Sequence, residues 1–213
     1  MRILPTILTA VTLTLSACGG SGSTAPSGRT PSLSITIATN PLTYGMSAQA
    51  SATITDASGN TSPASGVTWA STNSYVADVN ASGLVTAAAV GAAIISATAG
   101  GVTGQILVTV APGPPASVVI YSGEGQVGNH GTVLAAPLCV LVKDARGYVI
   151  PGVVATYTVT TGGGTLSSPT APSTDASGIA TSGLWSLGAL VGQQTIVASV
   201  SGAGSVTFHA TAQ

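Results

Sequence analysis

Apolar residues alternate with serine and threonine along much of this chain, and this pattern constrains the fold more than any other feature. The alternation runs through residues 33–37, 48–55, 153–159 and 206–211. Because successive side chains of a β-strand point to opposite faces, such stretches form strands with one apolar face and one Ser/Thr face. Neither half of the chain shows a convincing helical period. The pattern predicts an all-β fold of half-buried antiparallel strands.

A short turn motif, Asx-Ala-x-Gly, appears four times between these stretches. It begins at Asp56, Asn80, Asp144 and Asp175. The Asx side chain can accept hydrogen bonds from its own turn, and the glycine can adopt the positive φ that closes a hairpin. Three of these residues are among the 5 acidic residues of the chain, so we expect those carboxylates to serve turn geometry.

The chain carries very little charge. Only 4% of its 213 residues are charged, and the formal net charge is −1. An ordinary soluble domain has about 25% charged residues. This chain lacks the basic surface by which proteins bind nucleic acid and the polybasic patch that binds anionic lipid. We therefore expect no nucleic acid partner.

The first residues have the features of an export signal. Met1-Arg2 is a basic start, and residues 3–15 are uncharged and mostly apolar, which is too short for a membrane-spanning helix of roughly 20 residues. The segment at 15–19, Leu-Ser-Ala-Cys-Gly, then resembles the lipobox of bacterial lipoproteins. The resemblance implies that a signal peptide, residues 1–17, is removed and that acylated Cys18 anchors the chain in the lipid bilayer. The alternative is an ordinary secretory peptide with an incidental cysteine.

Residues 18–31 would then form a tether. They are rich in Gly and Ser, the composition of a flexible linker. Gly19 in place of aspartate resembles the sorting pattern of lipoproteins that reach the outer membrane. We expect an exported protein, lipid-anchored to the cell envelope at the outer membrane or cell surface.

A proline-rich stretch divides the rest of the chain. Residues 112–115 read Pro-Gly-Pro-Pro and favour a short, semi-rigid linker. They separate residues 32–111 from residues 116–213, and both segments have the usual size of a domain. If Cys18 is acylated, Cys139 has no partner for an intrachain disulfide. Each domain would then depend on its packing alone.

Three motifs follow one another in the first segment. They are Val-Thr-Trp-Ala-Ser at 67–71, Val-Ala-Asp-Val at 76–79 and Gly-Leu-Val-Thr-Ala at 83–87. Their order and spacing resemble a bacterial immunoglobulin-like (Ig-like) domain of group 2. The resemblance implies a β-sandwich over residues 32–111 with Trp69 in its core.

The second segment carries a different pattern. Residues 138–142 alternate ahead of the turn at Asp144, and a later turn follows within residues 174–180. This order resembles the group 1 Ig-like repeat of invasin and intimin, although Tyr148-Val149 stands where that family usually has Asn-Pro. The two resemblances imply two tandem Ig-like β-sandwiches, and the second one suggests adhesion.

Residues 84–102 form a long uncharged run that needs a separate interpretation. Its length would suffice for a membrane-spanning helix, but most of its residues are Ala, Gly, Thr and Ser, and no basic or aromatic anchors flank it. Gly91 and Gly100-Gly101 interrupt it. We predict two strands joined by a short loop.

The motifs for chemistry are weak. Residues 123–128 match GxGxxG, but the stretch at 129–137 is too short for the crossover of about a dozen residues that a dinucleotide fold needs. His130 and His209 are the only histidines, and no second His or Cys stands at ligand spacing. The 5 acidic residues are scattered, which disfavours calcium. A Ser–His–Asp arrangement stays open, but no GxSxG motif supports it. We expect no catalytic residues, no metal site and no cofactor.

The main functional hypothesis is a non-enzymatic, lipid-anchored envelope protein whose Ig-like modules act as a spacer or in adhesion. The alternative is a glycan- or peptidoglycan-binding module. Because such modules present aromatic platforms, Trp185 is the candidate ligand contact, with Tyr121 and Tyr148 as further outward aromatics. The partner would then be a protein or a glycan. An enzyme accessory domain or hydrolase is the third alternative.

Cys139 is expected to be partly exposed on the face of its strand opposite Val140.

Overall fold

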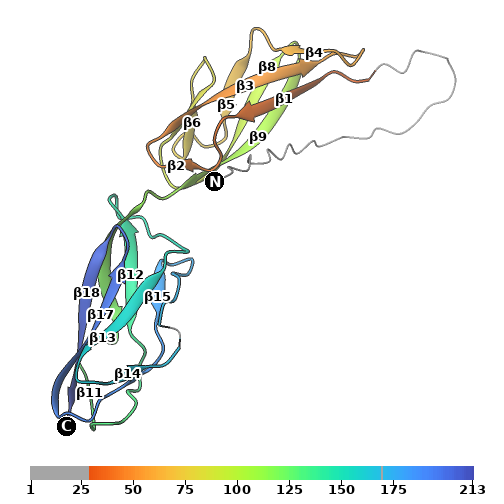
Figure 1. Cartoon of the computed structure of the whole chain (residues 1–213). Helices are drawn as coiled ribbons and strands as arrows, with labels where there is room; N and C mark the ends of the chain where they lie inside the picture. The colour runs from red at the N-terminus through yellow and green to blue at the C-terminus, as the bar shows by residue number, and fades with distance from the viewer. Residues whose placement is uncertain (1–28, 169) are drawn as a thin grey trace, which may run out of the picture.

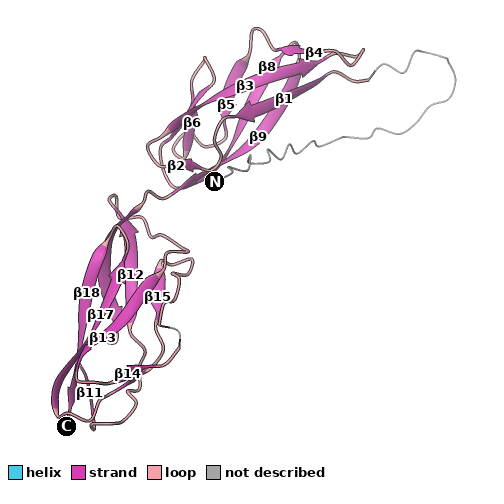
Figure 2. Ribbon diagram, in the orientation of Figure 1, coloured by secondary structure: helices cyan, strands magenta, loops and turns pink. Residues whose placement is uncertain are grey.

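The computed structural model describes residues 29–168 and 170–213, and their strands form two lobes (Figure 1). The first lobe has a core of residues between Leu33 and Val110, and the second has its own core between Val118 and Ala212. Every regular element in the described residues is a β-strand, which confirms the all-β class (Figure 2). Accordingly, these residues contain no helix with the length and apolar character to cross a membrane. The predicted signal peptide and Cys18 lie outside the described residues.

Two sheets pack face to face in the first lobe. One sheet has the order β1 (Ser32–Ile37), β3 (Ser47–Thr55), β7 (Leu84–Ala87) and β6 (Ala77–Val79), with β4 (Thr61–Pro63) also paired to β3. The other has the order β2 (Leu42–Thr43), β9 (Val102–Ala111), β8 (Gly91–Ala99) and β5 (Thr68–Ser71). Both sheets contribute side chains to one core.

The second lobe also encloses its core between two main sheets. One has the order β10 (Pro115–Ser122), β12 (Cys139–Asp144) and β15 (Ile179–Thr181). The other has the order β11 (Gln126–Gly128), β18 (Gly204–Ala212), β17 (Gly192–Val200) and β13 (Ala155–Thr161). A small pair, β14 (Thr165–Leu166) with β16 (Trp185–Ser186), lies beside them.

The predicted alternation places the expected residues in the cores. Along β1 the three apolar side chains are buried and the Ser and Thr side chains are exposed. In β18, Phe208 and Ala210 are buried, whereas His209 between them reaches the surface. Fully burying a large apolar side chain such as Phe208 stabilises the fold by about 1.5–3 kcal/mol.

The uncharged run at 84–102 forms β7 and β8 and the start of β9, as predicted. Gly100 and Gly101 make the turn from β8 to β9 with φ of 57° and 77°. The run therefore pairs within the first lobe rather than crossing a membrane as a helix.

The four Asx-Ala-x-Gly turns have the same geometry, as predicted. In each, the Asx Oδ1 accepts hydrogen bonds of 2.8–3.0 Å from the backbone N–H groups two and four residues later. The glycine N–H donates to the Asx carbonyl at 2.9–3.1 Å. The four glycines have φ between 74° and 90°, which other residues rarely adopt.

The predicted exposure of Cys139 is wrong. Only 8% of its surface is exposed, and its Sγ lies 3.4 Å from the Thr181 hydroxyl. Cys139 lies in the middle strand of its sheet, so Ser122 of β10 and Thr181 of β15 flank it on both sides.

Candidate functional site

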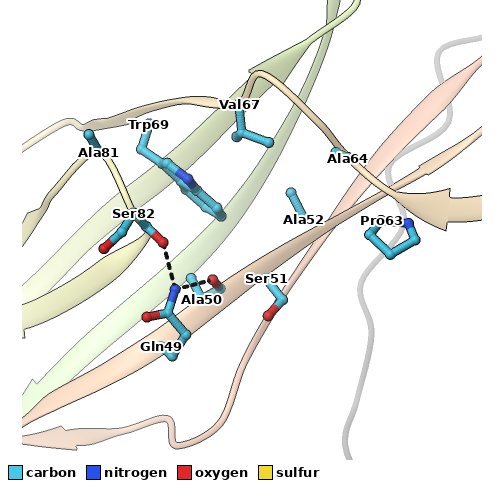
Figure 3. Close-up of a pocket in the computed structure, with 10 residues that line it drawn as sticks. All are labelled: Gln49, Ala50, Ser51, Ala52, Pro63, Ala64, Val67, Trp69, Ala81 and Ser82. Atoms are coloured by element: carbon cyan, nitrogen blue, oxygen red, sulfur yellow. Dashed lines mark hydrogen bonds between the residues drawn. The ribbon is translucent and has the colours of Figure 1, made fainter.

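A shallow groove opens on the first lobe where the pairing of β3 changes partner (Figure 3). β3 pairs with β7 through residues 47–49 and with β4 through residues 53–55. Residues 50–52 lie between these two ladders, and the groove of about 360 Å³ forms over them. A Trp, a Gln and Ser side chains line it together with smaller apolar residues.

Trp69 lies at the centre of this groove, between Val67 and Ser82 (Figure 3). Strand β5 carries it, and the indole is half-buried against the core of the first lobe. Trp69 therefore packs against the core, as the resemblance to group 2 domains implies, while part of the residue stays accessible in the groove.

Gln49 supplies the polar part of the groove. Its Nε2 donates hydrogen bonds to the carbonyl oxygens of Ser82 at 2.7 Å and Ala50 at 2.9 Å (Figure 3). The bond to Ser82 joins β3 to the turn at 80–83, and the two bonds together fix an amide beside the indole. An indole edge with a neighbouring amide and Ser hydroxyls can contact a ligand that has both C–H and hydroxyl groups, such as a sugar ring.

The prediction that Trp185 faces outward is wrong. Its side chain is 0% exposed and lies in the core of the second lobe. The indole Nε1 is buried without a hydrogen-bond partner among the described residues, and the backbone of Gly164 lies against it. A ring that is covered in this way presents no face to a ligand.

The two other aromatic candidates differ from each other. Tyr121 is exposed on β10, as predicted. Tyr148 is half-buried, and its ring lies 5.6 Å from the ring of Tyr44 in the first lobe. Tyr75, which the sequence did not single out, is 86% exposed, more than any other large apolar side chain in residues 29–168 and 170–213.

The GxGxxG segment, which the sequence favours as a flexible loop, forms a turn followed by the short strand β11, which pairs in parallel with β18. Its Glu124 pairs with His209: the carboxylate Oε1 lies 2.8 Å from the imidazole Nδ1, and Oε2 accepts the His209 backbone N–H at 3.0 Å. His130 is exposed in the loop after β11. Across residues 29–168 and 170–213, no group of three His, Cys, Asp or Glu side chains could hold a metal ion.

A protein family matches the first lobe, and solved structures match the fold of the chain. Residues 30–110 match the family model of the bacterial Ig-like domain (group 2), so this part of the chain is such a domain. This confirms the first resemblance. No curated protein sequence matches the chain.

Solved structures with a similar fold include FdeC and InvD. FdeC, an Escherichia coli adhesin, matches with a TM-score of 0.55 at 17% identity, over 84% of this chain and 63% of that one. InvD of Yersinia pseudotuberculosis matches with a TM-score of 0.53 at 21% identity, over 86% of this chain and 57% of that one. The chain thus spans less than two thirds of either structure, and at these identities the likeness is one of fold.

Proposed function

We propose that this chain is a non-enzymatic, lipid-anchored protein of the cell envelope in which two tandem Ig-like domains form a spacer or adhesion module. The observation that carries the proposal is the end-to-end arrangement of the lobes (Figure 1). The chain enters the first lobe at the end remote from the linker, and Gln213 lies at the far end of the second lobe. Such a path places the first lobe between residue 29, where the described chain begins, and the second lobe.

The second lobe is assigned to the group 1 Ig-like type as part of this proposal. Its turns at Asp144 and Asp175 follow β12 and precede β15, the order on which the resemblance to invasin-type repeats rests. The match to FdeC, which covers both lobes, supports an Ig-like pair, and FdeC is an adhesin. Export and outer-membrane sorting rest on the lipobox-like segment around Cys18.

Protease treatment of intact cells tests the anchor and the orientation together. We expect the two lobes of the wild-type protein to be cell-bound and removed by external protease. Cys18→Ala removes the thiol that would be acylated, so this variant should be lost from the membrane fraction. Cys139→Ala is the matched control, because that thiol is buried in the second lobe and should not affect anchoring. A Cys18→Ala protein that stays in the membrane would contradict lipid anchoring, and a protected wild type would contradict surface exposure.

A second candidate function is glycan or peptidoglycan binding at the groove, and the accessible indole of Trp69 favours it. Trp69→Phe shortens the platform while keeping an aromatic ring in the core, and Gln49→Ala removes the amide. Both should weaken binding on a glycan array and in a peptidoglycan pulldown by several-fold. Tyr75→Ala removes an exposed aromatic outside the groove and should change neither assay. Equal binding by all four proteins would exclude the groove.

A further inference from the structure

The two lobes contact each other through one turn of the second lobe. This turn, residues 144–148, follows β12 and lies beside the linker at 112–115 and beside Tyr44 of the first lobe. Figure 1 shows the chain passing from β9 of the first lobe into the second lobe. Three side chains of the turn make the contacts, and each contributes a different kind of interaction.

Asp144 holds the linker. Only 4% of its surface is exposed, and its Oδ1 serves its own turn in the same way as the Asx residues of the other three turns. Its Oδ2 accepts the backbone N–H of Gly113 at 2.9 Å. Because the other three residues of the linker are prolines, Gly113 is the only one with an N–H to donate. The single backbone donor of the linker is therefore bound to the second lobe.

Arg146 holds the first lobe. The other three turns have serine at this position, namely Ser58, Ser82 and Ser177. The Arg146 Nη1 donates to the Tyr44 hydroxyl at 3.1 Å, and the guanidinium carbon lies 4.7 Å from the centre of the Tyr44 ring. The turn therefore departs from the chain's own pattern at the residue that contacts the other lobe.

Tyr148 adds a third contact to the same residue. Its ring centre lies 5.6 Å from that of Tyr44, with the ring planes at 43°. Tyr148 also begins the Tyr-Val pair that departs from the Asn-Pro of the group 1 pattern. Arg146, which replaces the serine of the other turns, and Tyr148, which replaces the asparagine of the group 1 pattern, therefore both contact Tyr44. Tyr44 itself packs against the core of the first lobe.

We propose that the turn at 144–148 is a clamp that holds the two lobes at one fixed angle. Even a semi-rigid linker leaves two folded units some freedom to move relative to each other unless contacts between them restrict it. Here the linker is held through Gly113 and the first lobe is held through Tyr44, so the restraints lie on both sides of the possible hinge. The clamp stands independently of the lipid anchor and of any ligand.

Two variants remove one restraint each and have precedents within the chain. Asp144→Asn keeps an Oδ1 for the turn, as Asn80 does in the first lobe, but turns an amide N–H toward the Gly113 N–H. Arg146→Ser restores the serine of the other turns. Asp175→Asn is the matched control, because it makes the same change in a turn of the second lobe that does not contact the linker.

The test is electron–electron distance measurement on the full chain in detergent micelles, with Cys18→Ala and Cys139→Ala as background so that anchoring plays no part. Spin labels on cysteines at Gln105 and Thr207 report on the two lobes, since both positions are exposed in mid-strand. We expect one narrow distance peak for the parent and for Asp175→Asn. The peak should be lost or broadened in Asp144→Asn and in Arg146→Ser, and most in the double variant.

Two results would overturn the clamp: a broad distribution in the parent, or an unchanged narrow peak in the double variant. Circular dichroism melting shows whether each variant is folded. If Asp144→Asn unfolds the second lobe, Arg146→Ser still decides the matter, because the sequence Asp-Ala-Ser-Gly already forms this turn at Asp56 and at Asp175.

Discussion

Gly83 shows how one residue can serve both a turn and a site. It ends the second Asx turn with φ of 81°, a conformation that favours glycine. A Cβ at this position would lie 2.9 Å from the Trp69 ring and 2.9 Å from the Ala50 carbonyl oxygen. The turn can therefore lie on the indole only because residue 83 has no side chain, and this contact helps to fix the position of Trp69 in the groove.

Replacing this glycine should cost more stability than the turn geometry alone requires. Gly66 also has a positive φ of 62°, but a Cβ there would meet nothing within 4 Å. We expect Gly66→Ala to lower the free energy of unfolding by about 1–2 kcal/mol through the backbone alone. Gly83→Ala should lose roughly 1–3 kcal/mol more because it overpacks against Trp69 and Ala50. Urea unfolding of the full chain measures the loss of unfolding free energy in both variants. Equal losses would show that the close contact of residue 83 with Trp69 and Ala50 does not affect stability.

At the scale of elements, the turns were predictable because their interactions are local. The Asx side chain, the two N–H groups that it accepts and the glycine all lie within five residues, so four similar sequences form one geometry. The partner of the second carboxylate oxygen was not predictable. In Asp56 it accepts from Asn60 nearby, whereas in Asp144 it accepts from Gly113 across the lobe junction.

The strands, like the turns, were predictable only in their local features. Alternation predicts which side chains share a face, and in β1 and β18 that suffices. It does not predict what surrounds a side chain on the other face. Cys139, which lies between Ser122 of β10 and Thr181 of β15, and Trp185, which lies against the Gly164 backbone, were therefore misplaced. The groove at Trp69 was missed for a related reason, because it depends on where β7 stops pairing with β3 and β4 begins.

At the scale of the whole molecule, few groups determine how the stability changes in acid, because the chain carries few charged residues. The chain has 5 acidic residues, and the pKa values of Asp56 and Asp144 are below the ordinary value of 3.8. For Asp56 the main cause is hydrogen bonding from Asn60. For Asp144 burial raises the pKa, but hydrogen bonds from the backbone of Gly113, Tyr148 and Arg146 outweigh it. Both carboxylates therefore favour the folded state only while they are ionised.

The sign of the pH dependence follows from these directions. A carboxyl group whose pKa is lower in the folded state contributes stability above its unfolded pKa and loses it as the pH falls through the folded pKa. We therefore expect the free energy of unfolding to decline below pH 3.8, the ordinary value for both groups. Asp144→Asn should have lower stability at neutral pH and a shallower decline in acid, because one of the two responsible groups no longer titrates. Urea unfolding at a series of pH values measures both slopes. If the free energy of unfolding fell equally steeply with pH in the parent and in Asp144→Asn, ionisation of Asp144 would not contribute to stability in acid. The contact between Asp144 and the linker would then be tested by the distance measurement alone.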